Sequence, residues 1–211
     1  MIISLAGEIA LLAYHDDGIA RGSGGMLDYG VGGAVLLELA LAERVTVRDK
    51  NVVVLDPTPT GQEVLDEALR RIAGASRPRR PKAWVYRLGR HARPQVLDTL
   101  VASGVLQRER DRFLLVVPYT RYPAPGGVEP QPETDVRRRM RAAVTTTGPV
   151  DPRTAAMCAL IGALGWQKQV FGDLPGEQVK ARLTEIRESA WAAEAVRKAI
   201  VDLQVVVLAG I

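Results

Sequence analysis

The amino-acid sequence predicts a mainly α-helical protein, a single-domain helical bundle over residues 1–211 with β-hairpins at its periphery. Apolar residues recur at helical spacing in most segments, whereas alternating apolar residues occur only in short paired stretches. With 211 residues and 47% hydrophobic content, the chain buries enough surface to need no disulfide or metal. Its one cysteine, Cys158, excludes an intrachain disulfide.

The first part of the chain predicts two helices and a hairpin. Residues 4–14 carry apolar side chains at helical spacing, and residues 35–42 form a strongly apolar segment typical of a buried helix. Glycine-rich stretches at 22–25 and 30–33 precede this second helix. Residues 44–55 place alternating valines on both sides of a polar tip, which indicates a β-hairpin.

Residues 57–72 give the clearest local helix signal. Five apolar residues form one stripe at helical spacing: Val64, Leu65, Ala68, Leu69 and Ile72. Thr60 precedes this stripe, and Glu63 comes three residues after Thr60, which is the spacing of a capping box. We therefore expect Thr60 to be the N-cap of this helix.

The next segments predict two separate helices and a second hairpin. A short helix is expected over 84–88. Another is expected to begin at Arg93-Pro94, with Pro94 at the first helical position, and to stop at Gly104. Residues 105–117 then predict a hairpin with a charged turn at 108–112.

The last part of the chain predicts a loop and three helices. Residues 119–132 contain several prolines and predict the loop. Residues 135–144 predict a basic helix, and two further helices are expected over 154–164 and 177–201.

Charge is distributed unevenly. Residues 1–75 carry a net charge of −5, residues 76–141 a net charge of +9, and residues 142–211 are balanced. The middle segment holds two cationic runs: Arg77, Arg79, Arg80, Lys82, Arg87, Arg90 and Arg93, then Arg137, Arg138, Arg139 and Arg141. We expect these runs to contact an anionic partner. The alternatives are that they form solvated faces or pair with the acids of residues 1–75.

Several function classes are not expected. No apolar run approaches the roughly 18 residues of a membrane span, and the N-terminus lacks the basic region of a signal peptide. One cysteine and two histidines do not make the usual structural zinc site, and no phosphate-binding glycine motif is present. We expect no cofactor, no metal and no catalytic residue. The 23 arginines against 5 lysines are typical of a GC-rich genome and predict a bacterial source.

Five groups of short motifs occur along residues 5–203 in one order. They are Glu8-Ile-Ala-Leu-Leu with Asp17-Gly18; Gly30 and Gly33 with Leu36-Leu37-Glu38-Leu39-Ala40-Leu41; Pro59-Thr60-Gly61 with Leu65-Asp66-Glu67-Ala68-Leu69; Leu100-Val101, Gly104-Val105-Leu106 and Phe113-Leu114-Leu115; and Asp151, Arg153 and Ala159-Leu160-Ile161. This ordered set resembles the Golgi phosphoprotein 3 family. The resemblance implies a mainly helical, peripheral membrane protein that binds phosphatidylinositol 4-phosphate and the tails of membrane proteins.

The family's headgroup pocket uses one tryptophan and three arginines. By this resemblance two of the arginines fall on Arg90 and Arg93, the third on Gly32, and the tryptophan on Ser23. We expect Arg90 and Arg93 to bind a lipid headgroup, with Arg87 and the run Arg137–Arg141 in support, because a guanidinium fork matches phosphate oxygens. Arg90 and Arg93 either share one helical face or lie in the turn before Pro94.

The family's membrane-facing hairpin falls near residues 113–125. Here its apolar and aromatic residues are Leu114, Leu115, Val116, Val117, Tyr119 and Tyr122. We expect this hairpin to enter a membrane interface or to mediate self-association into a homo-oligomer. The expected partners are therefore an anionic phospholipid surface, membrane-protein tails and a second copy of the chain, at a cytoplasmic location peripheral to the membrane.

A DNA-binding alternative stays open. A helix over 93–103 followed by a hairpin is also the pattern of a winged helix, and its surroundings are basic. Of the side chains that read bases, this helix offers only Gln95, and Asp98 repels phosphate. We therefore prefer the lipid partner and do not expect nucleic acid.

Overall fold

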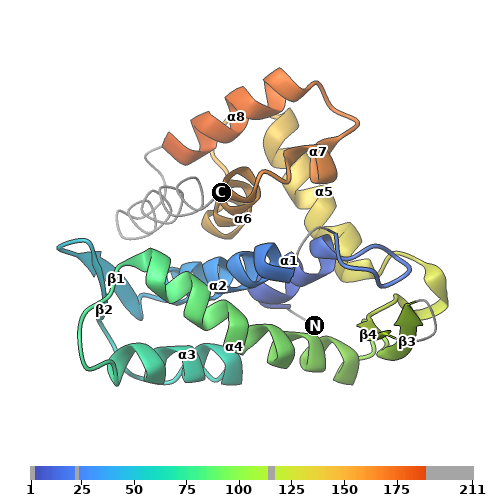
Figure 1. Cartoon of the computed structure of the whole chain (residues 1–211). Helices are drawn as coiled ribbons and strands as arrows, with labels where there is room; N and C mark the ends of the chain where they lie inside the picture. The colour runs from blue at the N-terminus through green and yellow to red at the C-terminus, as the bar shows by residue number, and fades with distance from the viewer. Residues whose placement is uncertain (1–2, 22–23, 114–116, 189–211) are drawn as a thin grey trace.

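The computed structural model describes residues 3–21, 24–113 and 117–188, and within them the fold is mainly helical, as predicted (Figure 1). Two β-hairpins are the only sheets of these residues. The elements are α1 (Leu5–Ala13), α2 (Gly24–Leu41), β1 (Val45–Arg48), β2 (Asn51–Val54), α3 (Glu63–Ala73), α4 (Pro81–Ala102), β3 (Glu109–Phe113), β4 (Val117–Arg121), a 3-10 turn (Pro125–Gly127), α5 (Gln131–Thr145), α6 (Pro152–Leu164), α7 (Gln167–Phe171) and α8 (Gly176–Glu188).

Helix α2 lies at the centre, between α1, α4 and α6, and the two hairpins lie at opposite ends of the molecule (Figure 1). It begins at Gly24, well before the predicted start at residue 35, so the second glycine-rich stretch is helical. Packing explains this difference. A Cβ on Gly32 would lie 1.9 Å from the Val85 carbonyl oxygen, and one on Gly89 would lie 1.7 Å from the Asp28 carbonyl oxygen. The glycines therefore allow the α2 and α4 backbones to approach closely.

Helix α4 is one continuous helix, so the prediction of two helices separated before Pro94 was wrong. Pro81, not Pro94, occupies the first turn, and Pro94 lies inside the helix. An internal proline costs about 3 kcal/mol because a backbone hydrogen bond is lost. Buried residues before and after Pro94, among them Val85 and Val96, lie on the same face of α4, and their burial offsets this cost. Gly104 ends the segment in the left-handed region (φ 72°), as predicted.

The start of α3 differs from the predicted capping box. Gln62 is the N-cap residue and makes no side-chain capping bond. Instead the Asp66 carboxylate reaches back and accepts hydrogen bonds from the Thr60 backbone N–H (2.6 Å), the Thr60 hydroxyl (2.7 Å) and the Gly61 N–H (3.2 Å). Although desolvation opposes them, these bonds lower the pKa of Asp66 below its usual value. Glu63 is left without a capping role.

The first hairpin matches its prediction, with Asp49 and Lys50 in the left-handed turn. The second is shifted. Residues 109–113, predicted in large part as its turn, form β3, and they pair with 117–121. Cross-strand ion pairs explain why a charged segment forms this strand: Arg121 lies 2.9 Å from Glu109 and 3.2 Å from Asp111.

The C-terminal helices α5 to α8 cover the side of the core that faces away from α3 and α4 (Figure 1). Asp151 caps α6 by accepting from the Thr154 N–H at 3.0 Å. Cys158 is buried in α6, and burial raises the pKa of its thiol to about 12. Helix α8 begins where predicted, while residues 189–201 of that prediction lie outside the described residues.

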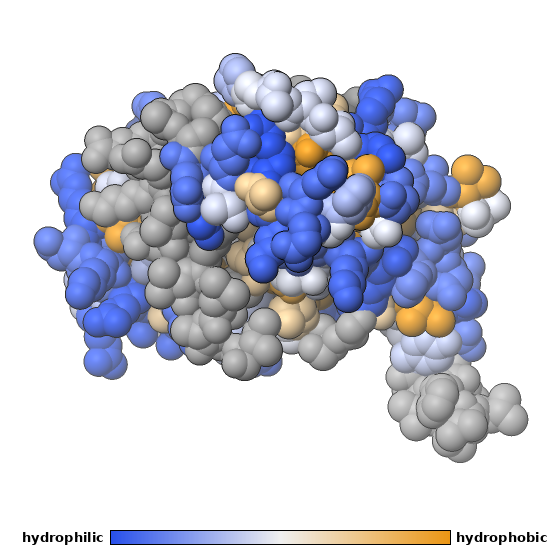
Figure 2. Space-filling model, turned by 90° about the horizontal axis from the view of Figure 1, so that it is seen from above, coloured by the Kyte–Doolittle hydropathy of each residue, from blue (hydrophilic) through white to orange (hydrophobic). Residues whose placement is uncertain are grey.

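The surface formed by the C-terminal helices is mainly hydrophilic where the residues are described, and its apolar residues occur in small groups (Figure 2). No described helix has both the length and the apolar character that crossing a bilayer requires.

Candidate functional site

Arg87 and Arg90 lie on the exposed face of α4. The Arg90 guanidinium stacks over the Tyr86 ring, 5.8 Å from its centroid, and donates to the Tyr86 hydroxyl at 3.3 Å. Among the described residues, Arg87 has no hydrogen-bonding or ion-pair partner, and neither arginine pairs with a carboxylate. Both cations are therefore available to an external anion.

Arg93 is also helical, one turn further along, but it is engaged inside the protein. Its Nη1 lies 3.4 Å from an Asp28 carboxylate oxygen on α2, and its side chain also hydrogen-bonds to Tyr14. Although desolvation lowers the pKa of Arg93, Tyr14 and Asp28 raise it above its usual value. Arg93 thus follows the alternative in which an arginine pairs with an acid of the N-terminal third.

The remaining cations of the first run lie near the N-terminus of α4. Arg80 is the residue before the helix, and Arg77 and Arg79 lie in the connection from α3. The Arg79 carbonyl accepts from the Val52 N–H at 2.9 Å, so this connection lies beside the first hairpin, whose tip carries Arg48 and Lys50. Within 3–21, 24–113 and 117–188, none of the side chains of Arg48, Lys50, Arg77, Arg79 and Arg80 forms an ion pair.

The second run, on α5, behaves differently. Each of its arginines pairs with a carboxylate: Arg137 with Glu133 (2.6 Å), Arg138 with Asp135 (2.7 Å), Arg139 with Glu8 (2.8 Å), and Arg141 with Asp173. These pairs neutralise the run, so it does not form the unpaired basic surface that would support a headgroup site.

The Arg139 pair belongs to a buried network that sequence reasoning missed. Glu8 and Glu38 are both buried, and Arg153 reaches them at 3.1 Å and 3.0 Å. The Leu5 N–H donates to Glu38 at 2.9 Å. Burial raises the pKa of Glu38, against the opposing effect of Arg153. The signal was a single glutamate inside each of two strongly apolar helices, because a buried charge needs a partner.

The second hairpin contains the residues predicted to meet a membrane or a second copy. Leu114, Leu115 and Val116 lie outside the described residues, as does the side chain of Val117. Tyr119 is exposed, and its hydroxyl donates to Asp111 at 3.3 Å. Tyr122 instead packs edge-on against Tyr14, with ring centroids 5.6 Å apart. Tyr122 is therefore partly buried against the body of the protein.

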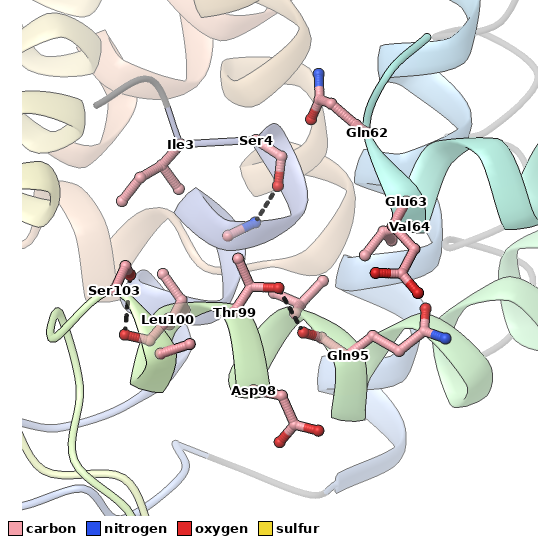
Figure 3. A pocket seen from close by; sticks show the side chains of 13 residues that line it. Ile3, Ser4, Gln62, Glu63, Val64, Gln95, Asp98, Thr99, Leu100 and Ser103 are labelled. Atoms are coloured by element: carbon pink, nitrogen blue, oxygen red, sulfur yellow. Dashed lines mark hydrogen bonds between the residues drawn. The ribbon is translucent and has the colours of Figure 1, made fainter. Parts of the chain in front are cut away.

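A cavity of about 600 Å³ opens where α1, α3 and α4 meet (Figure 3). Its lining residues come from the start of α1, the start of α3 and the second half of α4: Ile3, Ser4, Gly7, Gln62, Glu63, Val64, Gln95, Val96, Asp98, Thr99, Leu100, Ala102 and Ser103. None of the predicted headgroup arginines lines it. In the part of the chain that the structure describes, no three histidine, cysteine, aspartate or glutamate residues are placed to hold a metal ion.

These observations define a mainly helical protein in which one long helix presents arginines without carboxylate partners. The chain belongs to the Golgi phosphoprotein 3 (GPP34) family, whose family model matches residues 5–203. The positions that the resemblance assigned to the third arginine and the tryptophan do not supply those groups: Gly32 of α2 lies directly against the α4 backbone, and Ser23 lies outside the described residues.

Proposed function

We propose that this protein is a peripheral membrane protein that binds anionic phospholipid headgroups through Arg87 and Arg90. The observation that carries the proposal is that both guanidinium groups are exposed on α4 and lack a carboxylate partner within the described chain. A planar guanidinium offers paired donors that match phosphate oxygens. Family membership supports the same class of partner.

Tyr86 adds a second contribution. Its ring lies under Arg90 and is 43% exposed, and Tyr29 lies beside it with a centroid distance of 5.8 Å. The ring restricts the Arg90 side chain, so less conformational entropy is lost when a phosphate binds. An exposed tyrosine also suits a membrane interface, where its ring contacts apolar chains and its hydroxyl contacts water.

The cations near the start of α4 extend this surface. Arg77, Arg79 and Arg80, with Arg48 and Lys50 on the neighbouring hairpin, would add long-range attraction to an anionic bilayer. Each basic residue near such a surface contributes about 1 kcal/mol, and salt screens the effect. Several such contributions together would give membrane binding that is reversible and sensitive to salt.

General anionic recognition fits these residues better than strict recognition of phosphatidylinositol 4-phosphate. Of the family's pocket, Arg90 is unneutralised, Arg93 is paired with Asp28, and Gly32 has no space for a side chain. We therefore expect phosphatidylinositol 4-phosphate to bind as one anionic lipid among others.

Co-sedimentation with liposomes tests the proposal. Vesicles are neutral, generally anionic, or bear phosphatidylinositol 4-phosphate, and Arg87→Ala/Arg90→Ala is compared with the wild type. The control is Arg138→Ala/Arg141→Ala, which removes the same charge from exposed but ion-paired positions. We expect binding to anionic vesicles that salt weakens and that only the first variant loses. Equal loss in both variants, or no binding to any vesicle, would contradict the proposal.

A duplex DNA arm in the same assay addresses the nucleic-acid alternative. Binding to DNA without binding to vesicles would favour that alternative. Membrane-protein tails and a homo-oligomer stay predictions, as does the role of the second hairpin.

A further inference from the structure

We infer that the cavity between α1, α3 and α4 binds a small organic cation, an aliphatic chain that ends in a protonated amine. Its volume of about 600 Å³ lies within the range of small-molecule sites. Arg87, Arg90 and Arg93 do not line it, so this site is independent of the proposed lipid contact.

The floor of the cavity suits an aliphatic chain. Val96 and Leu100 of α4 are buried there, and Val64 of α3 and Ile3 before α1 are partly buried beside them. Gly7 makes room for Ile3 on the α1 side, because a Cβ on Gly7 would lie 2.4 Å from Ile3 Cγ2. A methylene chain placed against these residues would be removed from water.

The polar part of the cavity offers acceptors. Gln95 Oε1 is buried and has no hydrogen-bond partner among the described residues. It points toward the Glu63 carboxylate, which forms no ion pair within the described chain (Figure 3). Two acceptors that face each other need a donor between them, and a buried acceptor without a donor is costly. An ammonium group supplies three donors and the positive charge.

The charge of the lining also favours a cation. Glu63 and Asp98 stand at the rim, with Asp98 bonded to Arg108, and no lysine, arginine or histidine lines the cavity. Helix N-termini, which attract anions, also meet here. At α1 the Ser4 hydroxyl already accepts from the Gly7 N–H at 3.1 Å, and at α3 Asp66 already binds the preceding loop. We therefore expect the carboxylate and amide oxygens, and not the helix N-termini, to determine that the ligand is positively charged.

The test uses three probes of one length on the full chain: n-hexylammonium, hexanol and hexanoate. Methyl resonances of Ile3, Val64, Val96 and Leu100 report binding in this cavity by NMR titration. We expect hexylammonium to shift these methyls and to bind about tenfold more tightly than hexanol. Hexanoate should bind more weakly than both. Equal binding of hexylammonium and hexanol, tighter binding of hexanoate, or no shift with any probe would overturn the inference.

Two variants assign the contacts. Gln95→Met keeps the side-chain length but removes the acceptor, and should weaken hexylammonium binding about tenfold. Glu63→Gln removes an exposed charge and should weaken it about threefold. The control, Glu177→Gln, removes a glutamate from the first turn of α8 and should have no effect.

Two outcomes separate competing explanations. If the Gln95 amide donates to Glu63 instead, Gln95→Met leaves hexylammonium binding unchanged, which contradicts the site. If a capped lysine peptide shifts the same methyls while hexylammonium does not, the cavity recognises a protein side chain and the small-cation inference is wrong.

Discussion

The two arginine runs are similar in the sequence and differ in the folded protein. On α5, Glu133 precedes Arg137 by four residues and Asp135 precedes Arg138 by three, so helical geometry pairs them. On α4, no acid lies within one turn of Arg87 or Arg90 on the same helix. The density of arginines therefore says less about an anion site than the spacing of the nearest carboxylates.

Arg93 sharpens this comparison, because it belongs to the first run but is neutralised from another helix. Asp28 of α2 reaches it only because Gly32 and Gly89 bring α2 and α4 close together. Local spacing therefore identifies the pairs within one helix, whereas the partners of Arg93 and Arg139 come from other helices.

The largest effect is expected from the packing of α2 against α4, the helix that presents Arg87 and Arg90. Gly32→Ala places a Cβ 1.9 Å from the Val85 carbonyl oxygen and should lower the free energy of unfolding by about 3 kcal/mol. Urea denaturation measures it. Gly25→Ala is the control in the same helix, because a Cβ there has no neighbour within 4 Å. Equal stability of the two variants would show that α4 does not depend on this contact.

The next largest effect is a difference in the stability of the fold between variants of the two runs. Arg139→Ala leaves the buried Glu8 with Arg153 alone and should cost about 2 kcal/mol. Arg87→Ala removes no described contact and should change stability by less than about 0.5 kcal/mol. Urea denaturation measures the free energy of unfolding of both variants. A similar decrease in the two would mean that Arg87 has a structural role.

A smaller effect is expected from the release of Arg93. Asp28→Asn removes the carboxylate that neutralises the Arg93 charge and should tighten binding to anionic vesicles about fivefold, since one basic residue contributes about 1 kcal/mol there. Asp135→Asn makes the same change of charge and frees Arg138 on the other run. If both variants bind equally tightly in the sedimentation assay, net charge rather than position controls membrane binding.

The smallest effect concerns the pH dependence of one pair on the second run. The hydrogen bond from Arg141 lowers the pKa of Asp173 below the usual value of an aspartate. A lowered carboxyl pKa stabilises the fold above the ordinary pKa, and this is lost as the pH falls through the lowered value. Carboxyl NMR titration should show the pKa of Asp173 rising in Arg141→Ala and unchanged in Arg87→Ala. An unchanged pKa in Arg141→Ala would argue against the pair.

The sequence predicted the elements that follow from a regular spacing of apolar residues. The apolar stripes located the helices, and the valine alternation located the first hairpin. It did not predict that α4 continues through Pro94, because burial on both sides of the proline outweighs the lost hydrogen bond. It also placed Thr60 as a cap, although Asp66 does the capping from within the helix.

For the candidate site, the sequence did not distinguish the arginines that are exposed from those that form ion pairs inside the protein. Arg87 and Arg90 are exposed, whereas the engagement of Arg93 and Arg139 depends on Asp28 and Glu8, which are 65 and 131 residues away in the chain. Such pairing is a property of tertiary packing. The cavity combines residues from three helices, and its only sequence signal was Glu63, which the predicted capping box had already used.

The buried Cys158 has a practical consequence. A thiol with a pKa of about 12 is almost entirely protonated at neutral pH, and thiolate is the form that alkylating reagents attack. A cysteine introduced on the surface would therefore be the selectively labelled position without removal of the native one. A fluorophore or spin label attached in turn beside Arg87, Arg138 or Glu63 could then report which face meets a bilayer.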